Sequence, residues 1–133
     1  MTGPLSGLRV LDLGTRIAAP FCAGLLGEQG AEVIKVEQPR RGDFMREIGP
    51  FVPVEAMDPG YSLFWAVEGR GRQSVTLDLR RSEGQDLFRR LAATADVVVE
   101  NFRPGTLERL GLGGQTPSLR AAEEILSLIK ERA

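Results

Sequence analysis

The chain has 133 residues, 42% hydrophobic and 26% charged, which is ordinary for a globular protein with a single core. Seventeen Lys and Arg residues against eighteen Asp and Glu residues give a formal net charge of −1, so the overall charge favours neither a nucleic-acid nor an anionic-membrane partner. The chain has no histidine and one cysteine, Cys22, which excludes an internal disulfide, His-dependent nucleophiles and the usual His or Cys metal sites.

The first 37 residues predict one strand–helix–strand unit. Residues 8–13 (LRVLDL) and 31–37 (AEVIKVE) are apolar runs typical of strands. Between them Pro20 precedes a helical stretch over residues 21–30, and Gly30 is suited to ending it. Because this unit takes roughly thirty residues, it predicts a parallel pair of strands joined by a right-handed crossover.

The middle of the chain is predicted to be a long loop followed by a third strand. Residues 38–60 show no periodicity and contain four prolines, and loops of such length are usually functional or disordered. One or two helical turns are expected over residues 61–69, and a strand over residues 73–79.

A second helix and a fourth strand complete the predicted sheet. Ser82 and Gln85 have the spacing of a capping box, which predicts that a helix begins there. Residues 96–102 (DVVVENF) read as a buried strand, and residues 104–111 (PGTLERLG) as the start of a short helix. This order of elements predicts an α/β fold for residues 1–113, with a Rossmann-like parallel sheet and flanking helices.

Residues 114–133 are predicted to form a separate C-terminal amphipathic helix. Thr116 can cap it, and Pro117 suits its first turn. One apolar stripe follows, made of Leu119, Ala122, Ile125, Leu126 and Ile129. Such a stripe packs against its own domain or against a partner helix, and the sequence leaves both open.

Small or basic residues adjoin every predicted strand. They occupy residues 15–20, 39–46, 69–81 and 100–111. In open parallel sheets ligands bind beyond the carboxyl ends of the strands, and helix N-termini and arginines there can hold phosphates. An ordinary turn and a solvated basic loop are the simpler explanations for the first two segments. Taken together, the four segments predict a polyphosphorylated nucleotide lying across the strand ends.

The last of these segments offers the most varied recognition groups. Phe102 can stack on a purine, Asn101 can hydrogen-bond a ribose or an amide, and Arg103 and Arg109 can hold phosphates. Core packing is the alternative for Phe102. No catalytic pair is visible, and Cys22 is expected to be a buried structural thiol.

Several segments resemble the N-terminal portion of the class III CoA-transferases, a family that includes formyl-CoA transferase, carnitine CoA-transferase and the α-methylacyl-CoA racemases. They are a strand ending in LDL with the turn Ala18-Ala19-Pro20, then GAEVIKVE, SVTLDLR and ENFRPG. The resemblance runs from about Pro4 to Gly113.

The resemblance implies that coenzyme A, or acyl-CoA as substrate, binds to the Rossmann-like half. Gln38 stands where the family has a basic residue, and we expect Arg40 to substitute for it. The positions that match the family's CoA contacts are Ile17 and Ala18 through their main chain, Arg40, Leu77, Arg80, Asn101, Phe102, Arg103 and Arg109.

The resemblance also implies that the family's catalytic residue has no counterpart in this sequence. In the family an aspartate attacks the acyl-CoA thioester, and that aspartate lies on a downstream segment with no match here. We therefore expect a truncated relative that binds CoA without turnover, and we assign it no catalytic or metal-ligating residue. A CoA-binding subunit completed by a partner chain or a homodimer, a remnant, and a racemase-type relative are the alternatives.

The single cysteine and the lack of a targeting segment suggest a cytoplasmic protein. No apolar run approaches the roughly 18 residues of a membrane span. Asp12 and Arg16 interrupt the first apolar stretch, so residues 1–20 do not have the pattern of a signal peptide. Neither a nucleic acid nor a membrane is therefore expected as a partner.

Overall fold

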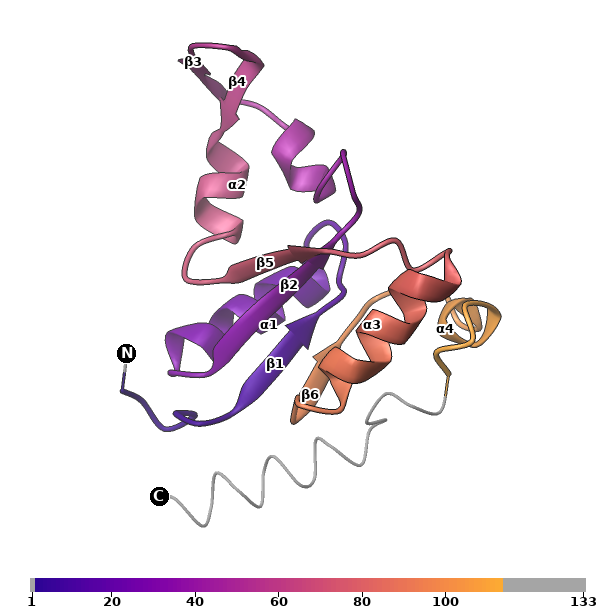
Figure 1. The fold of residues 1–133 in the computed structure, drawn as a ribbon. Helices are drawn as coiled ribbons and strands as arrows, with labels where there is room; N and C mark the ends of the chain where they lie inside the picture. Colours follow the sequence, from indigo (N-terminus) through magenta and orange to yellow (C-terminus); the bar gives the residue numbers. More distant parts are fainter. Residues whose placement is uncertain (1, 114–133) are drawn as a thin grey trace.

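A computed structural model describes residues 2–113, whose centre is a four-stranded, all-parallel sheet (Figure 1). The strands lie in the order β5-β2-β1-β6. Their bounds are β1 (Arg9–Asp12), β2 (Glu32–Glu37), β5 (Gln73–Thr76) and β6 (Val97–Val99). The predicted parallel α/β sheet is confirmed.

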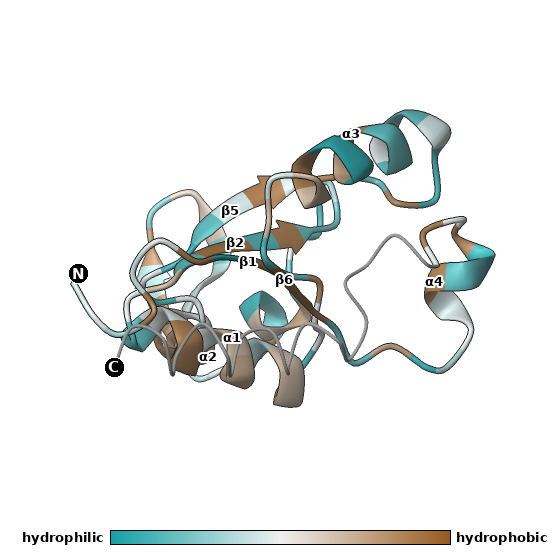
Figure 2. Cartoon of the chain, turned by 90° about the horizontal axis from the view of Figure 1, so that it is seen from below, coloured by the Kyte–Doolittle hydropathy of each residue, from teal (hydrophilic) through white to brown (hydrophobic). Residues whose placement is uncertain are grey.

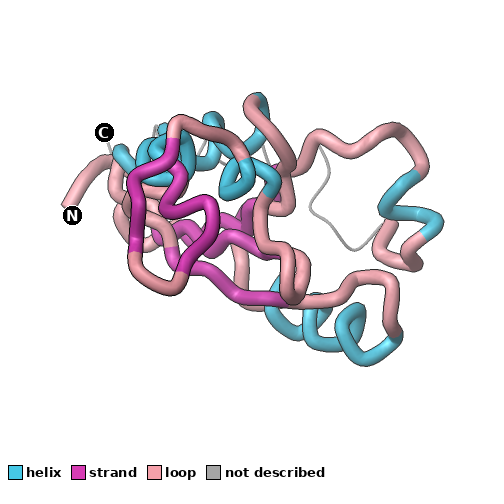
Figure 3. Tube along the Cα trace, turned by 90° about the horizontal axis from the view of Figure 1, so that it is seen from above, coloured by secondary structure: helices cyan, strands magenta, loops and turns pink. Residues whose placement is uncertain are grey.

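Successive residues of the two central strands face opposite sides of the sheet, so the domain has two apolar clusters. Val10 lies in the cluster under α1 (Ala18–Glu28), and its neighbour Leu11 lies in the cluster under α3 (Ser82–Ala92). The short helix α4 (Thr106–Arg109) closes the α3 side through Leu107. Figure 2 shows the hydropathy of these strands and of the helices that lie on both sides of them, and Figure 3 shows the same arrangement by secondary structure. Within the described range, no helix has the length and apolar character needed to cross a membrane.

The segment between β2 and β5 is more regular than predicted. A 3₁₀ helix, η1 (Phe44–Glu47), leads into an antiparallel hairpin of β3 (Phe51–Val54) and β4 (Met57–Ser62), which extends away from the sheet in Figure 1. Helix α2 (Leu63–Glu68) follows directly. The prediction of an irregular loop over residues 38–60 was therefore wrong.

The prolines of this hairpin explain why its strands escaped the sequence pattern. Proline removes a ladder hydrogen-bond donor and is confined to edge strands and bulges. Both strands of a two-stranded hairpin are edges, and Pro53 lies at the register irregularity between Val52 and Val54.

Helix boundaries differ from prediction at two places. Helix α1 begins at Ala18 rather than after Pro20. Pro20 fits inside the first turn because the N–H groups of that turn have no intrahelical acceptor, so the N–H that proline lacks costs no hydrogen bond. Gly30 ends the helix in a left-handed conformation (φ 100°), as predicted. The capping box was wrong: Arg81 is the N-cap of α3, and the Gln85 side chain donates to the Leu79 carbonyl instead.

Gly84 permits the close approach of α3 to the chain that follows β5. A Cβ at this position would lie 2.0 Å from the carbonyl oxygen of Asp78, which is backbone and cannot swing away. Helix α3 therefore packs directly on residues 77–80. The proposed division at residue 113 and the predicted C-terminal helix of residues 114–133 lie outside the described residues.

Candidate functional site

A pocket of about 480 Å³ opens at the carboxyl ends of the strands. Its walls come from the chain after β1 (residues 13–16), after β2 (residues 38 and 41–44), after β5 (residues 77–80) and after β6 (Phe102). The volume falls in the range of small-molecule sites. This is the edge of the sheet at which the sequence predicts a ligand.

The walls combine apolar surface with charged groups of both signs. The apolar part consists of Leu13, Val36, Phe44, Leu77, Leu79, Phe102 and Leu110, and the charged part of Arg16, Arg41, Arg80, Glu37, Asp43 and Asp78. Such a surface is suited to a flat, weakly polar ring next to anionic groups, because apolar walls fix the ring and guanidinium groups hold anions in pairs of hydrogen bonds.

The turn after β1 forms one wall, and buried groups fix its first residue. The Gly14 N–H donates to Asp12 Oδ1 over 2.8 Å, and its carbonyl accepts a hydrogen bond from Lys35 Nζ. A Cβ on Gly14 would lie 2.5 Å from the Cβ of Ala19, so a side chain has no room here. The turn therefore lies tightly against the first residues of α1.

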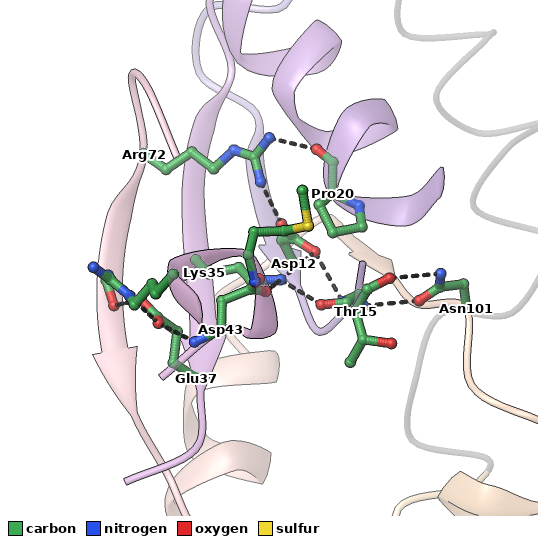
Figure 4. A network of polar contacts seen from close by, with 12 residues as sticks. Asp12, Thr15, Pro20, Lys35, Glu37, Asp43, Arg72 and Asn101 are labelled. Carbon is green, nitrogen blue, oxygen red and sulfur yellow. Dashed lines mark hydrogen bonds and ion pairs between the residues drawn. The ribbon is translucent and has the colours of Figure 1, made fainter. Parts of the chain in front are cut away.

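Asn101 fixes the next residue of this turn from the other side of the pocket. Its Oδ1 accepts from the Thr15 N–H over 2.8 Å, and its Nδ2 donates to the Thr15 carbonyl over 2.9 Å (Figure 4). These two bonds tie the end of β6 to the end of β1. Asn101 thus holds the backbone of the pocket wall, and its predicted contact with a ligand stays a prediction.

A buried ion network, shown in Figure 4, adjoins the pocket through Asp43, which lines it. The Nζ of Lys35 is 3.4 Å from Asp12 Oδ1 and 3.0 Å from Asp43 Oδ2, and all three side chains are almost fully buried. Arg72 contacts the other oxygen of Asp12 over 2.8 Å and donates to the Pro20 carbonyl. Burial raises the pKa of Asp12, and the neighbouring Lys35 and Arg72 oppose this.

A third buried carboxylate, Glu37, joins the loop after β2 to the sheet. Arg46 donates to both of its oxygens over 2.7 Å, and the Ser74 hydroxyl and the Asp43 N–H also donate to it. Burial alone would raise the pKa of Glu37, but these hydrogen bonds lower it to about 2. Arg46 also stacks on Trp65, 3.8 Å from the ring centroid, so the same group anchors α2.

The three arginines in the pocket wall differ in their contacts. Arg41 makes two hydrogen bonds with Glu47, of 2.6 and 2.7 Å. Arg80 approaches Asp78 at 3.4 Å. Arg16 stacks over Phe44, with 4.4 Å between its guanidinium carbon and the ring centroid.

The predicted site residues gather around this pocket to different degrees. Leu77, Arg80 and Phe102 line it, and Phe102 also packs on the apolar cluster under α3, so it is both core and wall. Asn101 and Arg109 do not line the pocket, but each hydrogen-bonds to a residue that does. Asn101 bonds to the backbone of Thr15, and Arg109 donates to the hydroxyl of Thr106 over 2.9 Å.

The remaining predicted residues lie next to lining residues in the sequence. Ile17 and Ala18 directly follow Arg16 and are exposed at the start of α1. Arg40 lies between Gln38 and Arg41, and Arg103 follows Phe102; both arginines are exposed. None of these four lines the pocket itself.

Sequence reasoning missed three residues that shape the site. Lys35 could have been noticed as a charge inside an apolar strand, which requires a buried partner. Arg16 and Phe44 lie in the selected segments 15–20 and 39–46, but neither was assigned a role of its own, because their contact joins two loops. The expectation for Cys22 was wrong: it is exposed, because the buried side of α1 is formed by Ala19, Pro20 and Ala23.

Comparison with known proteins identifies the family. The model of CoA-transferase family III matches residues 5–123. The β subunit of succinyl-CoA–L-malate CoA-transferase from Chloroflexus aurantiacus is 54% identical over 112 residues, which are 84% of this chain and 26% of that protein. A probable fatty acyl-CoA transferase of Mycobacterium tuberculosis is 46% identical over 110 residues, which are 83% of this chain and 27% of that protein.

Solved structures agree with this assignment. A CAIB/BAIF family protein from Brucella suis superposes with a TM-score of 0.77 at 40% identity, over 94% of this chain and 31% of the other. A crystal structure of a hypothetical protein from Mycobacterium tuberculosis gives a TM-score of 0.73 at 43% identity, over 85% and 29% of the two chains. The chain thus spans between about a quarter and a third of the length of these relatives. With its parallel sheet, its strand-end pocket and these matches, the chain belongs to CoA-transferase family III.

Proposed function

We propose that the chain binds coenzyme A and acyl-CoA thioesters in the strand-end pocket, as the CoA-binding portion of a family III CoA-transferase. The observation that carries this proposal is that Leu77, Arg80 and Phe102, which match CoA-contacting positions of the family, line one pocket. Family membership supports the same ligand, because CoA-transferases act on CoA thioesters.

The pocket's chemistry suggests how the ligand lies. The adenine ring packs against the apolar wall that includes Phe102, and the phosphates lie toward Arg80 and the exposed Arg103. The main chain of Ile17 and Ala18 lies at the start of α1, where unpaired N–H groups favour an anion. Arg40 and Arg109 add positive charge close to the rim.

We propose further that these residues alone bind the thioester without transferring its acyl group. Two carboxylates of the pocket wall, Asp43 and Glu37, are buried and tied to cations and to backbone N–H groups. The third, Asp78, accepts the N–H of Arg80 and lies 3.4 Å from its guanidinium, so all three are engaged and poorly placed to attack. The resemblance assigns the nucleophile to a downstream aspartate. An acyl-exchange assay between labelled CoA and an acyl-CoA tests this, and clear label transfer by the purified chain would contradict it.

Transfer is preferred to racemisation because the relatives compared above carry transferase names. The acyl group and its acceptor are not part of the proposal. A cytoplasmic location, inferred from the single cysteine, stays a prediction.

The exposed apolar surface of α1 and α2 supports association with a second copy or a complementary chain. Ile17, Phe21 and Leu25 recur every four residues along α1 and are 65%, 49% and 46% exposed. Phe64 and Val67 of α2 are 46% and 54% exposed, and the two helices are in contact. An apolar surface of this kind is typical of an interface.

Light scattering across a concentration series tests this association. We expect a dimer that weakens in the Phe21→Ser variant, whereas an Arg90→Ser control on the far helix α3 should leave it unchanged. A monomer at all concentrations, with no co-purifying chain, would speak against the association.

Calorimetric titration with CoA and dephospho-CoA tests the binding proposal. We expect saturable binding of CoA, and weaker binding of dephospho-CoA if exposed arginines read its extra phosphate. Absence of CoA binding at millimolar ligand would favour a remnant that folds without this function.

A further inference from the structure

Arg16 combines three features that no other described residue shares. It lines the pocket, its backbone is left-handed (φ 62°), and its guanidinium stacks on Phe44. Left-handed backbone is costly for residues other than glycine, and such strain is kept where the surroundings enforce it, often at functional sites.

The surroundings of Arg16 enforce this conformation from both sides. Thr15, before it, is held by the two hydrogen bonds from Asn101. Ile17, after it, accepts the N–H of Phe21 through its carbonyl and so begins the hydrogen bonding of α1. The position is thus fixed by contacts that do not involve the Arg16 side chain, and a glycine would satisfy the backbone better.

The side chain of Arg16 keeps its charge available. Among the pocket-lining arginines, Arg41 is paired with Glu47, and Arg80 approaches Asp78. Within residues 2–113, Arg16 makes no ion pair or side-chain hydrogen bond. Its contact with Phe44 is a cation–π contact, and its N–H groups have no hydrogen-bond acceptor within the described residues.

We propose that Arg16 is a binding residue for a phosphate group of the ligand, held ready by Phe44. This inference rests on the proposed function and adds to it a residue that the family resemblance did not supply, since that resemblance assigns only the main chain of Ile17 and Ala18 in this turn. A planar guanidinium with free edge donors is suited to grip two phosphate oxygens at once.

The test compares Arg16→Ala, Arg16→Lys and Arg16→Gly with the wild-type 133-residue chain. Calorimetry measures the affinity of each for CoA, dephospho-CoA and inorganic pyrophosphate, and Arg90→Ala on α3 is the matched control for loss of one exposed positive charge. We expect Arg16→Ala and Arg16→Gly to weaken CoA binding by between about tenfold and hundredfold, the range for a lost charge-assisted bond, with Arg16→Lys intermediate and Arg90→Ala within about twofold.

Thermal unfolding separates binding from structure. Because glycine relieves the left-handed strain, Arg16→Gly should keep a Tm within about 4 °C of the wild type even though it loses affinity. If Arg16→Gly instead loses far more Tm and Arg16→Lys restores Tm, Arg16 serves the fold, and the inference is overturned.

The ligand series separates this inference from the proposed function. CoA binding that is equal in the wild type and in Arg16→Ala overturns the role of Arg16 and leaves the proposed function standing. Loss of affinity for CoA but not for dephospho-CoA assigns Arg16 to the 3′-phosphate, and loss for both assigns it to the pyrophosphate; either result supports the inference. If the wild type does not bind CoA, the proposed function fails, and pyrophosphate binding that depends on Arg16 would still support the inference, whereas its absence would overturn both.

Discussion

Replacing Lys35 by methionine should destabilise the domain more than any exposed charge change. The Lys35 ammonium is buried among Asp12, Asp43 and the carbonyl of Gly14. Removing one partner of a buried ion pair typically costs 3–5 kcal/mol. Arg72 still pairs with Asp12, and Asp43 keeps one hydrogen bond from the Met45 N–H, so we expect about 3 kcal/mol.

The fluorescence of the single tryptophan, the buried Trp65, can follow urea unfolding of this variant. The matched control is Glu32→Gln, which lies on the same strand but breaks an ion pair to Arg9 whose side chains are 36% and 41% exposed. An exposed pair contributes about 0–1 kcal/mol. If Lys35→Met costs no more than this control at an unchanged m-value, the ion network does not support the pocket as described.

Three further predictions concern the walls of the pocket. Because the pKa of Glu37 is lowered to about 2, the stability that its ionised form contributes is complete above about pH 4.5 and is lost as the pH falls through 2. Glu37→Gln should therefore be less stable than the wild type by about 2–3 kcal/mol at pH 7. Thermal unfolding should show this difference shrinking toward pH 2, and a constant difference would contradict the prediction. Gly84→Ala should destabilise by about 1–3 kcal/mol in urea unfolding, because its Cβ would meet the Asp78 carbonyl at 2.0 Å, whereas helix propensity alone would make alanine stabilising. Asn101→Asp keeps the acceptor for the Thr15 N–H but loses the donor to the Thr15 carbonyl, so it should lower the free energy of unfolding by about 1 kcal/mol. Asn101→Ala removes both hydrogen bonds and should speed amide hydrogen exchange at Thr15, and unchanged exchange would contradict the two hydrogen bonds between Asn101 and Thr15.

The parallel sheet could be predicted because its strands are short, continuous apolar runs alternating with helical stretches. Val10 and Leu11 face opposite clusters, as strands covered on both faces require. The location of the pocket followed from the same topology, since polar residues directly after parallel strands meet at one edge. The residues after β5 and β6 were found in this way.

The hairpin and the polar interior could not be predicted, because they depend on contacts between distant segments. Pro53 argued against a strand, and only its place at an irregular edge made it compatible with one. Asp43 lies in the segment that was expected to be an irregular loop, yet it is buried as a partner of Lys35 on β2. Ser82 and Gln85 have capping-box spacing, but the motif needs Ser82 as the N-cap, and the helix begins one residue earlier, with Arg81 as its N-cap.

We propose that the strand ends form one binding site for the adenosine-containing part of CoA. Titration of the ¹⁵N-labelled chain with CoA, followed by amide chemical shifts, tests this claim most directly. We predict saturable shifts in three separate segments, residues 14–17, 77–80 and 101–103, which lie around a single pocket. Shifts confined to the hairpin or to the outer side of α3, or no shifts at millimolar CoA, would contradict it.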